Sequence, residues 1–248
     1  MKVCPKHALK LTPDGMLVDR ALCDVCGKCV EACPANALEV LGKRYAVEEV
    51  VGTVIRDKLF YEKSGGGMTL SGGEPSIQTA FSQALMQEIG DKGIHTAIET
   101  CAGTSWEALR PLVESARLIL LDLKLMDEVK HREYTGVPLG TVLANARRVA
   151  DLGKEIWVRT PIIPGYTDSE SNVRSVARFI LENLSTATRY DLLAFNNLCV
   201  TKYERLGLHW QLAGVGLVTV KTMETLSGAA RSEGLGNVHW SGMTKSQE

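Results

Sequence analysis

The sequence predicts an α/β protein in which a parallel sheet curls into a full or partial (β/α) barrel, preceded by a small cysteine-rich module. Between Met68 and Trp240, short apolar runs alternate with stretches whose apolar residues follow a helical period, a pattern typical of strand–helix–strand units. Five of the seven cysteines fall within the first 33 residues, ahead of this alternation. We therefore expect the module at residues 1–44 and the barrel at residues 45–248.

Net charge and apolar content indicate which partners and which compartment to expect for this protein. The net charge is -1, which gives no long-range field for nucleic acid or an anionic membrane. No apolar run is long enough to cross a bilayer, and the first residues lack the apolar core of a signal peptide. We expect a soluble, cytoplasmic protein with no nucleic-acid or membrane partner. In a reducing compartment, clustered thiols indicate metal binding rather than disulfides.

The cysteines of the module have the spacing of an iron–sulfur protein. The run Cys23-x-x-Cys26-x-x-Cys29-x-x-x-Cys33-Pro34 matches the bacterial ferredoxin pattern. In two-cluster ferredoxins the last cysteine of each run serves the other cluster. We therefore expect Cys4, which also precedes a proline, to complete a 4Fe-4S cluster with the first three cysteines of the run. Cys33 then lacks three upstream partners, and a structural zinc site is the less favoured alternative.

Residues 46–62 carry apolar side chains at helical spacing, from Val47 to Leu59. This spacing predicts a surface helix, which would join the module to the barrel as a rigid element. The strands that we predict in the barrel are Met68–Leu70, Ile94–Glu99, Leu118–Lys124, Ile156–Thr160, Tyr190–Phe195 and Val238–Trp240. The predicted helices between them are Ile77–Ile89, Ser105–Ser115, Val142–Leu152, Ser169–Asn183 and Val220–Ser232.

Polar residues follow the ends of the predicted strands. They are Glu74, Glu99 with Thr100, Asp122 with Lys124, Arg159 and Asn196. Reactive residues of parallel barrels gather at the C-terminal ends of the strands, so we expect these side chains to share one face. Gly72 and Gly73 precede Glu74 and would let a ligand approach bare backbone. Pro75 is expected to open the helix that follows.

The stretch Ser64–Pro75 resembles the Ser-Gly-Gly-Glu-Pro signature of the glycyl radical enzyme activating family, a branch of the radical S-adenosylmethionine (SAM) enzymes. The similarity continues through Glu99–Gly103, Leu121–Lys124, His131–Gly136 and Arg159–Tyr166. Members that resemble this chain carry a ferredoxin-like insert where its cysteines lie. The resemblance covers nearly the whole chain and implies a partial (β/α) barrel of the radical SAM type with a 4Fe-4S module at its N-terminus.

The resemblance also implies a ligand, S-adenosylmethionine, that carries an ammonium, a carboxylate and a ribose. In the family, the signature containing Gly72, Gly73 and Glu74 binds the ammonium. Glu99, with Thr100 beside it, and Asp122 are then candidates for the ribose hydroxyls, and Lys124 and Arg159 are candidates for the carboxylate.

Two departures from the family pattern affect these expectations. Where many members have Pro-Tyr-His late in the barrel, this chain has Ala194-Phe195-Asn196, so an amide would meet the nucleoside.

The family's Cys-x-x-x-Cys-x-x-Cys, whose three thiolates hold the catalytic cluster, is absent. Cys101 and Cys199 have no partners at that spacing, and we interpret both as buried small residues. We interpret the chain as truncated at its N-terminus, and we expect it to be inactive as it stands.

By resemblance, the family's members cleave S-adenosylmethionine reductively and generate a glycyl radical on a partner enzyme. The implied partners are a glycyl radical enzyme as protein substrate and a flavodoxin- or ferredoxin-type reductant. A different class of function is also open: a non-catalytic 4Fe-4S electron-transfer module on a barrel scaffold, which would have no affinity for S-adenosylmethionine. A barrel enzyme with a structural zinc is the third reading.

Overall fold

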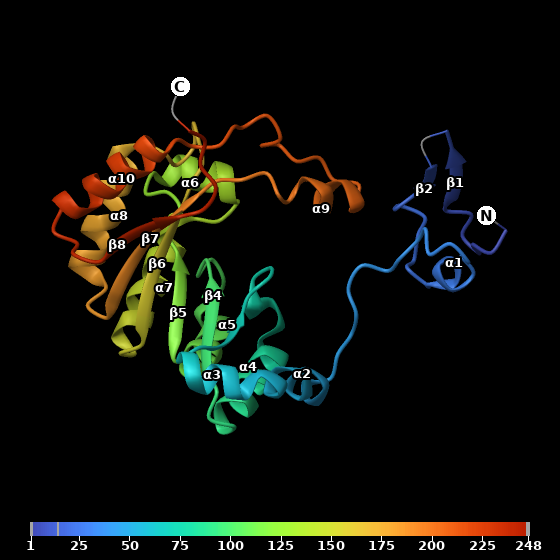
Figure 1. Ribbon diagram of the computed structural model, residues 1–248, viewed down its shortest axis with the longest axis horizontal. Helices are drawn as coiled ribbons and strands as arrows, with labels where there is room; N and C mark the ends of the chain where they lie inside the picture. Colours follow the sequence, from blue (N-terminus) through green and yellow to red (C-terminus); the bar gives the residue numbers. More distant parts are fainter. Residues whose placement is uncertain (1, 14, 247–248) are drawn as a thin grey trace. The chain divides into compact units, whose positions relative to one another are not determined.

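The structure is a computed structural model that describes residues 2–13 and 15–246 (Figure 1). The chain forms two compact units, Met1–Ala46 and Val47–Glu248, which we call the N-terminal unit and the barrel unit. In the described part of the chain, no helix is long and apolar enough to cross a membrane.

The N-terminal unit contains an antiparallel hairpin and one short helix. Strands β1 (Leu9–Thr12) and β2 (Gly15–Val18) pair with each other, and helix α1 spans Lys28–Glu31. Among its described residues, 2–13 and 15–46, Ala8 alone is buried. Leu11 and Leu17 of the hairpin are more than half exposed. Hydrophobic burial therefore contributes little to the stability of this unit.

The barrel unit is built on a parallel sheet with the strand order β3-β4-β5-β6-β7-β8. The strands are β3 (Gly67–Leu70), β4 (His95–Thr100), β5 (Leu118–Asp122), β6 (Glu155–Ile162), β7 (Ala187–Ala194) and β8 (Val238–Ser241). Spatial order follows chain order, so every crossover connects neighbouring strands and all six C-terminal ends lie at one edge. Each predicted strand is present, and the predicted fold class is confirmed.

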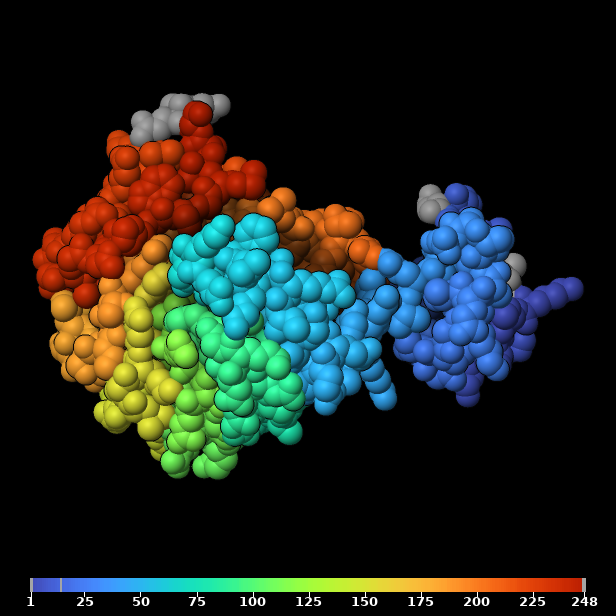
Figure 2. Space-filling view, turned by 60° about the horizontal axis from the view of Figure 1, so that its bottom comes forward, coloured from blue at the N-terminus to red at the C-terminus, as the bar shows by residue number. Residues whose placement is uncertain are grey.

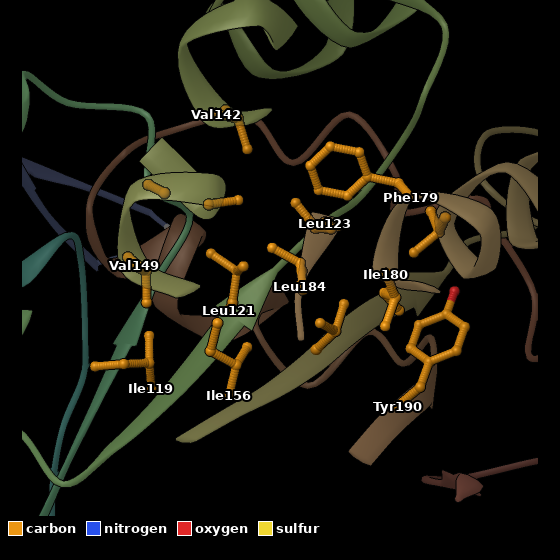
Figure 3. Close-up of a cluster of buried hydrophobic side chains, with 14 of the residues drawn as sticks. Ile119, Leu121, Leu123, Val142, Val149, Ile156, Phe179, Ile180, Leu184 and Tyr190 are labelled. Atoms are coloured by element: carbon orange, nitrogen blue, oxygen red, sulfur yellow. The ribbon is translucent and has the colours of Figure 1, made fainter. Parts of the chain in front are cut away.

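Helices connect the strands, and those of ten or more residues pack on one face of the sheet (Figure 1). The connecting helices are the 3-10 helix η2 (Pro75–Gln78) and the α-helices α4 (Thr79–Asp91), α5 (Trp106–Ser115), α6 (Glu128–Thr135), α7 (Leu139–Asp151), α8 (Glu170–Asn183), α9 (Val200–Arg205) and α10 (Val220–Ser232). Figure 3 shows the core between sheet and helices, where Ile119 and Leu121 of β5 meet Val149 of α7. The sequence did not lead us to predict the short helices α6 and α9.

The two faces of the sheet differ in chemistry, because successive side chains of a strand point to opposite sides. On β6, Ile156 and Val158 are fully buried against the helices, whereas Trp157 and Arg159, which alternate with them, are partly exposed. On β6 the second face therefore carries an aromatic and a charged side chain that are partly exposed, with Arg159 nearer the C-terminal end of the strand.

The helix predicted at residues 46–62 is interrupted in the structure. Helix α2 (Val47–Val54) and helix α3 (Lys58–Ser64) are separated by the 3-10 turn η1 (Ile55–Asp57). Apolar spacing cannot distinguish the two helix types over one turn, because both bring residues three apart onto one side. Val51 of α2 packs on Leu85 and Ile89 of α4, so this segment belongs to the barrel unit (Figure 2). Residues 42–46 before it have no regular secondary structure, which makes a rigid helical connection wrong.

Candidate S-adenosylmethionine site and cluster-binding cysteines

Three neighbouring strands bring an ion cluster to the C-terminal edge of the sheet. Arg159 at β6 places Nη2 2.5 Å from Oε1 of Glu99 on β4 and 2.7 Å from Oδ1 of Asp122 on β5. Its Nε also donates to Asp122 Oδ1 at 3.0 Å. Asp122 and Arg159 are direct partners in the strand register, which explains the short contact. We call Glu99, Asp122, Lys124 and Arg159 the ion cluster.

Burial within the ion cluster differs from one member to the next. The side chains of Arg159 and Asp122 are 14% and 18% exposed, whereas Glu99 and Lys124 are each 36% exposed. Burial raises the pKa of Asp122, and this outweighs the opposing effect of Arg159 and Lys124. Burial by itself lowers the pKa of Arg159, but its hydrogen bonds and charge interactions with Glu99 and Asp122 together raise it. Lys124 Nζ lies 3.8 Å from Asp122 Oδ2. Because Glu99 and Lys124 are the more exposed members, they are the ones that a ligand can reach.

Glu74 lies in a second polar group, between the ends of β3 and β4. Its Oε1 accepts hydrogen bonds from the amide and hydroxyl of Ser76, at 3.3 and 3.0 Å. Thr100 Oγ1 lies 2.9 Å from both carboxylate oxygens, and the amide and thiol of Cys101 donate to Oε2 at 3.1 and 3.4 Å. Glu74 is the N-cap of η2, with Pro75 as the first residue of that helix, as predicted. The carboxylate thus joins two strand ends.

The loop after β4 is held by Thr100, a predicted site residue, and by Asn145, which we did not predict from the sequence. Ala102 is fully buried with a φ of 50°, a left-handed conformation that costs a non-glycine residue about 1 kcal/mol or more. Thr100 Oγ1 accepts its amide at 2.9 Å. Asn145 of α7, which is 2% exposed, donates through Nδ2 to the carbonyls of Ala102 and Thr104, at 2.9 and 2.8 Å. The sequence did carry a signal for this contact, because Asn145 is the one polar residue among the buried residues of α7.

The glycines before Glu74 expose backbone at the same edge. Gly72 has a φ of 119°, which strongly favours glycine. Both Gly72 and Gly73 are exposed, and a Cβ built on either would meet no atom within 4 Å. The space beside these two residues is therefore open to a ligand. Asn196, two residues beyond β7, instead accepts the amide of Leu198 at 3.1 Å, and its side chain has no hydrogen bond to the ion cluster in residues 47–246.

Cys101 and Cys199 have different surroundings. Burial raises the pKa of the Cys101 thiol, and the charge of Glu74 adds to this effect. The thiol is only partly buried and is engaged by Glu74, so our interpretation of Cys101 as a buried small residue is incomplete. Cys199 is also partly buried and precedes α9.

In the N-terminal unit, Cys4 and Cys33 begin two turns of the same geometry. Each is followed by proline, and the third residue after each, His7 and Asn36, has a φ of 52° and 49°. The amide of that residue donates to the cysteine carbonyl at 3.2 Å in both turns. The next amide donates to the sulfur, at 3.3 Å for Cys4 and 3.2 Å for Cys33. Hydrogen bonds from the amides of Ala37 and its neighbours lower the pKa of Cys33, which suits this thiol to bind metal as a thiolate.

The loop that carries the other cysteines also departs from ordinary backbone. Val25, between Cys23 and Cys26, has a φ of 56°, which is a strained conformation for a β-branched residue. All seven cysteines are free. Within the described residues, no three His, Cys, Asp or Glu side chains are grouped to hold a metal ion, so the sulfurs of this loop are not gathered around one point.

The donors nevertheless fit an iron–sulfur cluster. Every candidate ligand is a thiolate donor, two of the sulfurs accept amide hydrogen bonds, and the unit has almost no apolar core. Domains this small commonly need a metal or disulfides for stability.

Two protein-family models match the chain. The model of the radical SAM superfamily matches residues 32–175, which include β3 to β6 and the whole ion cluster. The chain belongs to the radical SAM superfamily. A 4Fe-4S binding domain model matches residues 16–39. These memberships identify the cofactors as a 4Fe-4S cluster and S-adenosylmethionine, and they confirm the resemblance seen in the sequence.

The relatives of this radical SAM chain include proteins named as activating enzymes. The isethionate sulfite-lyase activating enzyme of Oleidesulfovibrio alaskensis is 41% identical over 207 residues, which cover 82% of this chain and 66% of that protein. The pyruvate formate-lyase-activating enzyme of Staphylococcus aureus is 32% identical over 70% of this chain and 71% of that protein. The chain spans about two thirds of the length of such relatives.

A solved structure supports the same assignment. The crystal structure of a domain of pyruvate-formate lyase-activating enzyme from Bacteroides vulgatus superposes with a TM-score of 0.59 at 25% identity. The match covers 71% of this chain and 99% of that domain. The barrel unit therefore has the α/β architecture of radical SAM proteins.

Proposed function

We propose that this chain is the SAM-holding and ferredoxin-like part of a glycyl radical enzyme activating protein. The ion cluster at the C-terminal edge of β4 to β6 is the observation that carries the proposal. The exposed Gly72 and Gly73 follow β3, the strand next to β4, at the same edge of the sheet. The relatives named as activating enzymes support a protein substrate, a glycyl radical enzyme.

Exposure divides the predicted ligand-binding residues into two kinds. Glu99 and Lys124 contact the ligand. Lys124 binds the carboxylate of S-adenosylmethionine, and Glu99 accepts hydrogen bonds from its ribose hydroxyls. Arg159 and Asp122 are more buried, and they hold these two side chains in place. Because the oxygens of Glu74 are engaged by Ser76, Thr100 and Cys101, Glu74 contributes negative charge while the open backbone of Gly72 and Gly73 receives the ammonium.

The cofactors, when bound, supply the one-electron reduction and the radical that takes a hydrogen from the partner's glycine. In the N-terminal unit, Cys4, Cys23, Cys26 and Cys29 hold one 4Fe-4S cluster, and the turn at Cys33 offers a further thiolate. The reductant is a flavodoxin or ferredoxin. Seven free cysteines suit a reducing compartment, and we place the protein in the cytoplasm.

Equilibrium dialysis with labelled S-adenosylmethionine tests the site directly. We expect the chain to bind it, and Lys124→Met to weaken binding by about tenfold, the effect of one charge-assisted hydrogen bond. Lys92→Met is the matched control, because Lys92 is exposed and precedes β4 at the opposite edge of the sheet. Absence of binding would refute the proposal and favour the electron-transfer module. Equal losses in the two variants would refute the role of Lys124.

A second assay addresses the expected inactivity. After anaerobic reconstitution with iron and sulfide, we expect no sustained release of 5′-deoxyadenosine from this chain. Sustained release would show that our expectation of inactivity is wrong, and the dialysis result would stand independently of it.

A further inference from the structure

Lys124 lies just beyond β5, in a segment without regular secondary structure. The strand ends at Asp122, and residues 123–127, which lead to α6, are neither strand nor helix. The ammonium of Lys124 is 3.8 Å from Oδ2 of Asp122, and the side chain is 36% exposed, so this contact by itself holds the ammonium weakly. A lysine carries its charge on a flexible four-carbon stem. The place of the ammonium therefore depends on how firmly the backbone of Lys124 is held.

Strand β6 fixes the residue before Lys124. The amide of Leu123 donates to the carbonyl of Arg159 at 3.0 Å. The carbonyl of Leu123 accepts the hydroxyl of Thr160 at 2.6 Å. Thr160 is fully buried, and its oxygen also accepts the hydroxyl of Tyr190 at 3.0 Å. These bonds hold the chain on the N-terminal side of Lys124.

One buried side chain of α8 holds the chain on the other side. Asn172 is 6% exposed. Its Nδ2 donates to the carbonyls of Lys124 and Thr167, at 3.1 and 3.3 Å. Its Oδ1 accepts the amide of Met126 at 2.9 Å. An asparagine side chain offers N–H donors and a carbonyl acceptor, and here both kinds of group bind the backbone that follows β5.

Helix α8 gives Asn172 a fixed position. Ser169 is the N-cap of the helix, and its hydroxyl accepts the amide of Asn172 at 3.2 Å. Val173 and Val176 of the same helix are fully buried. Asn172 is the third helical residue, where a capping box has Glu or Gln with its side chain turned back to the cap. The side chain of Asn172 reaches the segment after β5 instead, so its role extends beyond the start of its own helix.

We propose that Asn172 is a positioning residue for Lys124, acting on one side of it while Thr160 acts on the other. By fixing the backbone, Asn172 keeps the ammonium where the carboxylate of S-adenosylmethionine binds. This inference deepens the proposed function and rests on it. Without Asn172, the side chain of Lys124 must be ordered when the ligand binds, which weakens binding. Because Asn172 acts through Lys124, only a ligand that has a carboxylate should detect its loss.

Equilibrium dialysis with S-adenosylmethionine and with its decarboxylated form tests the proposal. The two ligands share the ammonium, the sulfonium and the nucleoside. We expect Asn172→Ala to weaken binding of S-adenosylmethionine by about fivefold, the effect of ordering one side chain, and to leave binding of the decarboxylated form unchanged. In the Lys124→Met background, Asn172→Ala should cause no further loss, because two changes to one interaction are not additive. Equal losses for the two ligands, or a further loss in that background, would overturn the inference.

The folded state of each variant is verified by tryptophan fluorescence at the assay temperature. If Asn172→Ala does not fold, Thr160→Val takes its place. This substitution nearly keeps the shape of the side chain and removes the donor to the carbonyl of Leu123. The same selective loss of S-adenosylmethionine binding is expected, and an equal loss for the two ligands would again overturn the inference.

A measurement without ligand follows Lys124 itself. Acetylation by an N-hydroxysuccinimide ester is read by mass spectrometry, with the exposed Lys92 as internal reference. We expect the rate at Lys124 relative to Lys92 to rise by about threefold in Asn172→Ala, because the released segment opens more often. Asn145→Ala is the matched control, since Asn145 is also a buried asparagine and binds the loop after β4. Equal changes in the two variants, or no change in either, would contradict the proposal.

Together the two measurements separate this inference from the proposed function. If the native chain binds S-adenosylmethionine and Asn172→Ala has no selective effect, the inference fails alone. If the native chain binds neither ligand, the proposed function fails, and the acetylation rates still decide whether Asn172 holds Lys124.

Discussion

Removal of Arg159 tests whether the ion cluster is organised as the structure indicates. In Arg159→Met, the carboxylates of Glu99 and Asp122 lose the nitrogen that now lies 2.5 and 2.7 Å from them. In the native structure these two contacts hold the oxygens within about 5 Å of each other, and two like charges at that distance repel by about 3 kcal/mol at an effective dielectric constant of about 20. Because the cluster is partly exposed, we expect the barrel unit to lose about 2–3 kcal/mol at pH 7.5.

The loss should depend on pH in a defined direction. Burial and the charge of Glu99 raise the folded-state pKa of the Asp122 carboxyl, and removal of Arg159 takes away the interactions that oppose this rise. A raised folded pKa means that the folded state binds the proton more readily. The variant therefore regains stability as the pH falls through the raised pKa. We expect the difference in stability from the native chain to shrink as the pH is lowered from 7.5 toward 5.5.

Urea unfolding followed by tryptophan fluorescence measures this difference. Trp106, Trp157, Trp210 and Trp240 all belong to the barrel unit, so the N-terminal unit does not contribute to the signal. With a denaturant slope of about 2 kcal/mol per molar urea, the midpoint should fall by about 1–1.5 M.

Arg178→Met is the matched control, because Arg178 is 57% exposed and pairs with Glu233 on the surface. It should cost less than about 1 kcal/mol. Equal losses in the Arg159→Met and Arg178→Met variants, or a loss in Arg159→Met that does not change with pH, would refute this account of the ion cluster.

Three further predictions concern other parts of the chain. Asn145→Ala should destabilise the barrel unit by about 2–3 kcal/mol in the same assay, because the carbonyls of Ala102 and Thr104 lose their donor; a loss below 1 kcal/mol would contradict this. Anaerobic reconstitution should give about four irons per chain, with Cys26→Ser lowering the iron content and Cys33→Ser preserving it; zinc without acid-labile sulfide would favour the zinc alternative. Arg174 and Arg178 lower the pKa of Glu233 to about 2 from 4.5, so the stability that Glu233 contributes should be present above pH 4.5 and disappear toward pH 2. Melting curves of Glu233→Gln should therefore approach those of the native chain only in acid.

Elements with a strong local signal were predictable from the sequence. The six strands are short apolar runs separated by helical patterns, so their number and approximate positions followed from periodicity. The N-caps Ser105 and Ser169 fixed the starts of α5 and α8 within one residue. Their side chains accept an amide three positions on, a contact that is specified entirely within one turn.

Short polar elements were not predictable in this way. Helix α6 contains few apolar residues, so no periodic face marks it, although Asp127 caps its start and Gly136, with a φ of 75°, ends it. The break at Ile55–Asp57 was also invisible, because an α-helix and a 3-10 turn place similar residues on one side.

The sequence by itself determined the types of residue at the candidate site and the strand ends from which they come, because strand ends follow from local pattern and Gly-Gly-Glu-Pro is a contiguous signal. Only the tertiary structure decided which of these residues meet. Register places Arg159 opposite Asp122, and packing of α7 brings Asn145 to the loop after β4. These contacts join residues 37 or more positions apart, and strand pairing and helix packing, rather than local sequence, bring such distant residues together.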